Sequence, residues 1–90
     1  MNIESKFASR RKAFLAQRYP AVYADMVKEG VLEAHLTRIG QDAKKLFDRI
    51  MEHNRAQIEA IEDPEKRQIK QTQIELMAEE VALNEIVLTL

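Results

Sequence analysis

The sequence predicts an all-α protein with four helices, dominated by a long antiparallel helical hairpin. Three observations lead to this fold class. Only two Gly and two Pro occur in 90 residues, which leaves too few turn residues for an all-β fold. Apolar residues recur at helical spacing over most of the chain. The strong helix breakers, Tyr19-Pro20, Gly30 and Asp63-Pro64, separate four segments of one domain, residues 1–90.

Two short helices are predicted first, over residues 3–18 and 20–29. The first carries one apolar stripe, formed by Ile3, Phe7 and Phe14. Arg10 and Arg11 interrupt this stripe, and we expect their stems to cover it while their charged heads reach outward. The second helix should end at Gly30, because glycine readily adopts the left-handed conformation that closes a helix.

The hairpin itself is predicted from helices over 31–61 and 64–88. In the third helix, apolar residues are spaced four and three residues apart, as in a coiled-coil seam. Gly40 leaves a kink or a brief break near residues 39–41 open, whereas the unbroken seam favours a helix that keeps its direction. Asp63 is suited to cap the fourth helix, which then starts at Pro64. The predicted helix-interface residues are Leu32, Leu36, Ile39, Leu46, Phe47, Ile50, Ile58, Ile61, Ile69, Leu76 and Val81.

What covers this seam is open from the sequence. Apolar residues near the hairpin tip, Ile58, Ile61 and Ile69, are expected to be exposed, because the surrounding segment is almost entirely polar. Either the two N-terminal helices cover the seam within one chain, or a partner covers it. That partner is a second copy, forming a homodimer, or a different protein.

The charge distribution is uneven although the net charge is only −1. Residues 1–30 hold six Lys or Arg against three acidic residues, and residues 63–90 hold three against six. One interpretation is that the two ends of the chain pack together and pair. The other is that the basic end contacts nucleic acid or an acidic partner. The residues that would do so are Lys6, Arg10, Arg11, Lys12 and Arg18.

The sequence predicts no catalytic residues, no cofactor and no metal site. It has no Cys, and its two histidines, His35 and His53, lie about five helical turns apart. Neither a nucleophile motif nor a glycine-rich phosphate loop occurs. We therefore expect a protein that is not an enzyme, does not enter a membrane and resides in the cytoplasm.

Helix-packing positions of this chain resemble a known family. The pattern comprises Arg10-Arg11-x-x-Phe14-Leu15, Pro20-x-x-Tyr23, Gly30-x-Leu32-x-Ala34-x-Leu36-x-x-Ile39, Ala43, Phe47 and the stretch Ala78-x-Glu80-Val81-x-x-x-Glu85-Ile86-Val87. It is similar to the small transposon-encoded proteins called TnpV, and it covers about residues 9–88. This chain departs from the family pattern at His35, Gly40 and Leu83.

The resemblance implies a bacterial mobile element as the setting. We expect a non-enzymatic accessory or regulatory protein that acts by protein–protein interaction, including as an inhibitor of a host or element-encoded nucleic-acid enzyme. The alternative is a DNA-binding regulator, an accessory factor for excision or transcription that uses the basic first helix.

Overall fold

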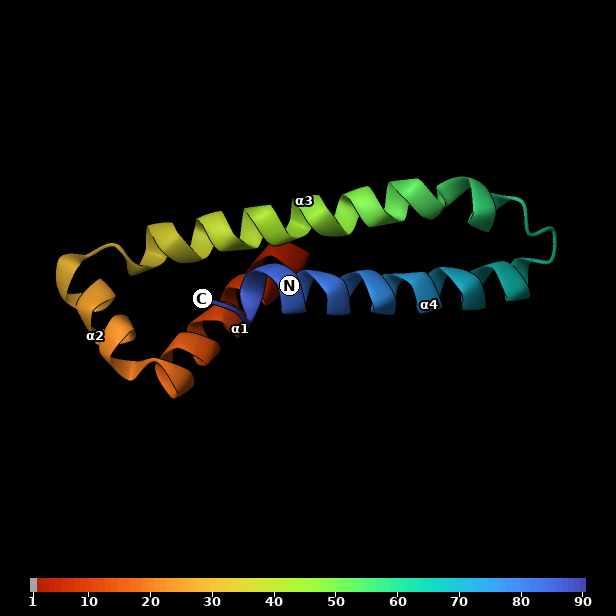
Figure 1. Ribbon diagram of the computed structural model, residues 1–90. Coiled ribbons are helices and arrows are strands. Elements are labelled where there is room, and N and C mark those ends of the chain that lie inside the picture. The colour runs from red at the N-terminus through yellow and green to blue at the C-terminus, as the bar shows by residue number, and fades with distance from the viewer. Residues whose placement is uncertain (1) are drawn as a thin grey trace.

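The structure, a computed structural model, describes residues 2–90 and confirms the all-α fold in that part of the chain. The α-helices are α1 (Ile3–Arg18), α2 (Pro20–Glu29), α3 (Leu32–Glu59) and α4 (Pro64–Ala82), and a π-helical turn, η1 (Leu83–Val87), follows α4 directly. Helices α3 and α4 form the long hairpin, which α1 crosses at an angle (Figure 1). Helix α2 connects α1 back to the start of α3.

The helix ends follow from local chemistry. The Asn2 side chain accepts a hydrogen bond from the Ser5 amide at the start of α1. Gly30 ends α2 with φ of 72°, a left-handed conformation that costs glycine little. At the hairpin tip, the Asp63 carboxylate accepts from the amides of Glu65 and Lys66, so α4 starts at the next residue, Pro64.

Helix α3 runs as one α-helix through Gly40, so no break interrupts it there. Gly40 is a packing position: α1 lies so close that a Cβ atom at Gly40 would be 2.7 Å from the backbone oxygen of Glu4. Burial then follows the predicted seam along α3, from Leu32 and Leu36 to Ile58 near the tip. The seam thus faces α1 at one end and α4 at the other.

The last predicted helix differs at its end. The α-helix stops at Ala82 and continues as η1, where the Leu88 amide donates to the carbonyl of Leu83, five residues earlier. A turn widened in this way is uncommon in proteins. Here it lies beside a buried arginine of α1, described below, that binds two carbonyl oxygens at this end of the chain.

The core lies at one end of the hairpin. In one cluster, Phe7 of α1 packs with Ala43 of α3, Ala82 of α4 and Val87 of η1, all four fully buried. A second cluster, centred on Leu15, joins α1 and α2 to the first turns of α3. We call this part the base: residues 2–47 and 76–90. The rest of the hairpin, residues 48–75, is the arm, which gives the molecule its length of 54 Å against a width of about 20 Å.

Candidate functional site

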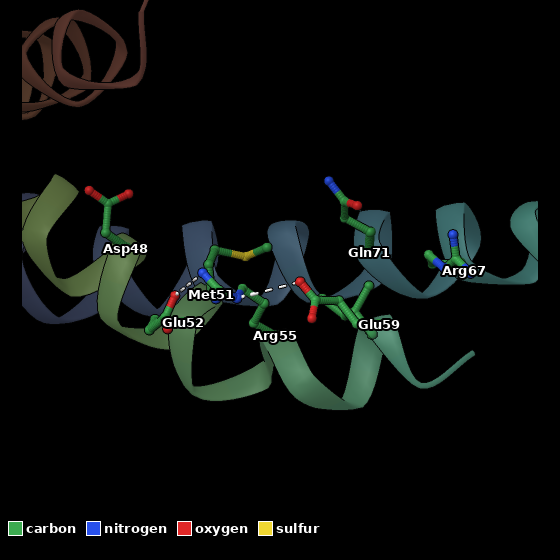
Figure 2. A pocket seen from close by; sticks show the side chains of 8 residues that line it. Asp48, Met51, Glu52, Arg55, Glu59, Arg67 and Gln71 are labelled. Atoms are coloured by element: carbon green, nitrogen blue, oxygen red, sulfur yellow. Dashed lines mark hydrogen bonds and ion pairs between the residues drawn. The ribbon is translucent and has the colours of Figure 1, made fainter. Parts of the chain in front are cut away.

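The arm carries an open groove on one face, between α3 and α4. Met51 and Ile58 supply its apolar surface from α3, and Arg67 and Gln71 border it from α4 (Figure 2). Its volume is about 500 Å³. The remaining lining residues are Asp48, Glu52, Arg55 and Glu59. A groove of this size can hold several side chains of a partner, but it is too open to enclose a small molecule.

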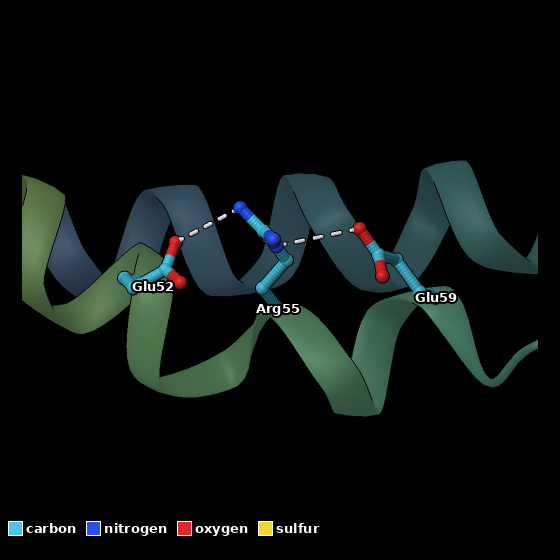
Figure 3. A network of polar contacts seen from close by, with 3 residues as sticks. All are labelled: Glu52, Arg55 and Glu59. Carbon is cyan, nitrogen blue, oxygen red and sulfur yellow. Dashed lines mark hydrogen bonds and ion pairs between the residues drawn. The ribbon is translucent and has the colours of Figure 1, made fainter.

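The charged residues of the groove are largely paired with one another. The Arg55 guanidinium lies 3.3 Å from a Glu52 carboxylate oxygen and 3.5 Å from one of Glu59, all three on α3 (Figure 3). Arg67 donates hydrogen bonds to the backbone carbonyls of Ile61 and Glu62 and so ties the start of α4 to the tip loop. These contacts leave no concentration of positive charge in the groove.

The groove continues the surface that α1 covers in the base. On α3, Lys44 lies near Glu4 of α1 and forms an ion pair with Asp48, which lines the groove. On α4, Glu79 pairs with Lys6 of α1 at 2.5 Å, and Gln71 lies two turns before Glu79 on the same side of the helix. Helix α1 therefore packs on α3 and η1 in the base, and its Phe7 and Lys6 side chains reach the C-terminal end of α4. In the arm, no helix of residues 2–90 covers the groove.

The five basic residues predicted to form one contact surface are divided by the structure. Lys6 forms the ion pair with Glu79, and Arg11 is buried with only 4% of its surface exposed. Arg10, Lys12 and Arg18 are exposed. Arg10 and Lys12 flank Arg11 on opposite sides of α1, because consecutive helical residues are about 100° apart. Among the described residues, one ion pair, Lys6 with Glu79, joins the basic and the acidic ends of the chain.

The expectation that Arg11 reaches outward is wrong. Its guanidinium donates to the carbonyl oxygens of Val87, at 2.9 Å, and Thr89, at 2.5 Å, and to Nε2 of His35, at 3.2 Å. It also lies 5.6 Å from the ring centre of Phe14. The apolar stripe of α1 packs against the hairpin, and Arg11 lies within it, so the charge is directed to the unpaired carbonyls at the end of η1.

This arrangement favours the neutral form of the His35 imidazole. Burial, followed by the nearby cations of Arg11 and Arg38, lowers the pKa of the His35 imidazole. Only a neutral imidazole can accept the hydrogen bond that Arg11 donates. Nothing in the sequence indicates this contact, because Arg11 lies 24 residues before His35 in the chain.

The pH dependence of folding should report this contact. Because the pKa of His35 is lowered in the folded state, protonation favours the unfolded chain, and stability is lost as pH falls through the folded-state pKa. We expect the free energy of unfolding in urea to fall between pH 7.5 and 5.0 by more in the wild type than in His35→Gln. Equal losses in the two proteins would show that His35 does not contribute.

The predicted helix-interface residues divide into three groups. Leu32, Leu36 and Ile58 are buried, so the expectation that Ile58 is exposed at the tip is wrong. It is covered because the arm end of the seam packs against α4. Those partly buried are Ile39, Leu46, Phe47, Ile50, Ile61 and Val81. Ile69 and Leu76 are 54% and 62% exposed and take no part in the hairpin interface.

The groove itself was not predicted as a site. Its two arginines and its acidic residues read in sequence as an ordinary solvated helix face, and only the antiparallel pairing of α3 with α4 brings them together. Within residues 2–90, no three potential metal-ligating side chains gather. No helix there combines the length and the apolar character needed to cross a membrane.

Comparison with known proteins agrees with the family resemblance. The model of the family described as "Transposon-encoded protein TnpV" matches residues 3–87, which include all of α1 to α4 and η1. No curated protein and no solved structure matches the chain. The family match extends over the base and the arm alike, so both belong to the conserved unit that the family model describes. The chain is therefore a member of the TnpV family of transposon-encoded proteins.

Proposed function

We propose that this chain is a non-enzymatic accessory or regulatory protein of a bacterial mobile element, which acts by binding another protein through the arm groove. The observation that carries the proposal is the unequal covering of the hairpin. Helix α1 packs on α3 and η1 in the base, with Phe7 buried against both hairpin helices, whereas no helix of residues 2–90 covers the groove of the arm. Family membership supplies the setting, a transposon.

The occupant that best fits the groove is a helix of a larger protein. In the base, α1 inserts the apolar side chain of Phe7 between the two hairpin helices and adds an ion pair at the edge through Lys6. The arm groove offers the same elements: apolar surface at Met51 and Ile58, and charged groups on both sides. Helix-in-groove binding uses an apolar face of this kind.

The charges of the groove favour a protein over a nucleic acid. Three carboxylates and two guanidinium groups line it, so its formal charge is negative. Phosphate backbones are attracted by clustered Lys and Arg, which this surface lacks. The partner class we propose is a nucleic-acid enzyme of the element or its host, such as a recombinase or nuclease, which the chain assists or inhibits by occupying a surface.

A DNA-binding regulator remains the alternative function. Two of its five proposed contact residues, Lys6 and Arg11, are engaged within the chain. The three exposed ones, Arg10, Lys12 and Arg18, do not converge on one face of α1. Binding by this helix would therefore be weak and dependent on low salt.

Binding measurements on groove variants separate the two functions. In cells that carry the element, we expect tagged wild-type chain to co-purify with the element's recombinase, and Met51→Arg to lose it by about tenfold or more. The matched control is Gln17→Arg, an exposed position on α1 that should have no effect. Circular dichroism of both variants checks that helical content is unchanged.

A different set of results would show DNA binding instead. If the purified chain retards DNA in a gel without any protein partner, and Arg10→Glu abolishes the retardation while Met51→Arg does not, the DNA-binding function is correct. Equal recovery of the recombinase by wild type and Met51→Arg would exclude the groove as the binding surface.

A further inference from the structure

A second apolar surface lies on the side of α4 that faces away from α3. Ile69, Leu76 and Met77 are 54%, 62% and 42% exposed, whereas Ile74 and Ala78, on the opposite side of the helix, are buried. Thr72 and Gln73 lie between the apolar residues and are also exposed. We call these five exposed residues, Ile69, Thr72, Gln73, Leu76 and Met77, the α4 outer face.

The α4 outer face is distinct from the arm groove. Arg67 and Gln71 are the α4 residues that line the groove. A shallow depression of about 500 Å³ lies on the outer face instead, around Ile69, with Thr72 and Gln73 in its lining. An occupant of one surface therefore leaves the other free.

The charge order along α4 identifies what fits this face. Residues 65–70 contain Lys66, Arg67 and Lys70 against one acidic residue, and the second half of the helix with η1 is acidic only. The acidic residues of that half are Glu75, Glu79, Glu80 and Glu85. This order is the reverse of the one that the helix dipole favours, with acids near the N-terminus and bases near the C-terminus.

Few ion pairs within residues 2–90 use this charge. Among the ion pairs of the described residues 2–90, one reaches α4, between Lys6 and Glu79, and none joins α3 to α4. Lys66 and Glu80 are both exposed and lie on the same side of α4 as the outer face. They are 14 residues apart, with Gln73 midway between them.

We propose that the α4 outer face binds a second copy of this chain, with the two α4 helices antiparallel and a twofold axis at Gln73. In this arrangement Ile69 of each copy meets Leu76 and Met77 of the other, and Lys66 of each meets Glu80 of the other. The surface is complementary to itself, as a twofold interface requires. A parallel arrangement would instead place Lys66 against Lys66 and Glu80 against Glu80.

This dimer goes beyond the proposed function and does not depend on it. It is a property of the purified chain, measured without recombinase or DNA, so either proposal can fail while the other stands. A dimer joined through α4 would carry two arm grooves. It could therefore bind two partner molecules.

Mass measurements over a range of concentrations test the dimer. In sedimentation equilibrium we expect the wild-type chain to rise from its monomer mass of 10.4 kDa toward twice that value. Leu76→Glu should raise the dissociation constant by about tenfold or more, because it introduces a charge at the apolar centre. Val27→Glu, at a position in α2 that is 53% exposed, is the matched control and should leave dimerisation unchanged.

Charge exchange tests the antiparallel arrangement. Lys66→Glu alone and Glu80→Lys alone each place two like-charged pairs in the interface and should weaken the dimer, on the order of tenfold. The double variant Lys66→Glu, Glu80→Lys restores both pairs with opposite signs and should return the affinity to that of the wild type. Failure of this restoration would overturn the antiparallel arrangement.

A disulfide reporter gives a second test that does not rely on a disruptive charge. The chain has no Cys, so Gln73→Cys introduces a single thiol beside the proposed axis. We expect a disulfide-linked dimer under mild oxidation, and none for the control Gln57→Cys, an exposed position on α3. A wild-type chain that stays monomeric up to about 1 mM, or equal crosslinking of both Cys variants, would overturn the proposal.

Discussion

Arg11→Ala is expected to lower the free energy of unfolding by about 3 kcal/mol, because it leaves carbonyl oxygens of Val87 and Thr89 without a donor. The guanidinium also contributes packing against Phe14 that alanine does not replace. For a domain of this size, such a loss corresponds to a fall in melting temperature of roughly 12–24 °C. Thermal and urea unfolding followed by circular dichroism measure both quantities.

The neighbouring arginine supplies the control. Arg10 is exposed and has no hydrogen bond or ion pair described within the chain, so Arg10→Ala should change stability by at most about 0.5 kcal/mol. A similar effect of the two substitutions would mean that Arg11 does not hold the C-terminal segment. Arg11→Lys should recover only part of the loss, because an ammonium group cannot reproduce the planar set of guanidinium donors.

Gly40→Ala is expected to destabilise the protein by about 1–2 kcal/mol, although alanine is the better helix former. In an exposed helix interior this substitution would add about 1 kcal/mol of stability. Here the new Cβ atom would lie 2.7 Å from the Glu4 backbone oxygen, so α1 must move away from α3 or the helix must distort. Displacing α1 would loosen Phe7, which is fully buried.

The contribution of helix propensity to stability can be measured separately at an exposed position of the same helix. Ala56 is exposed on α3, in the arm. Ala56→Gly should lower the free energy of unfolding by about 1 kcal/mol from helix propensity alone. Urea unfolding of both variants then isolates the packing contribution at Gly40. A Gly40→Ala protein more stable than the wild type would show that α1 does not pack as closely as the structure describes.

Most of the helix pattern is determined by local signals that the sequence displays. Gly30 and Pro64 mark helix boundaries through backbone geometry alone, and both boundaries lie where the sequence predicts them. The packing role of Gly40 was not predictable in this way. It comes from the close approach of α1, a contact between residues 36 positions apart in the chain.

The site residues were harder to predict than the fold. Arg11 reads in sequence as one of several surface cations, and only the tertiary structure places it beside carbonyls 76 and 78 residues further along. Ile69 and Leu76 were assigned to the hairpin interface because they are apolar and helically spaced. The structure packs α4 through Ile74, Ala78 and Ala82 instead, on the side of the helix opposite to Ile69 and Leu76.

A photo-crosslinking scan in cells that carry the element asks whether the arm is the part of the molecule that binds other proteins. A photoreactive amino acid would replace Glu59 in the arm groove, Gln73 on the α4 outer face and Gln17 on α1, each an exposed position. We expect an element-encoded nucleic-acid enzyme to be crosslinked from position 59, a second copy of the chain from position 73, and neither from position 17. Crosslinks to that enzyme from position 17 and none from position 59 would contradict a function carried by the arm.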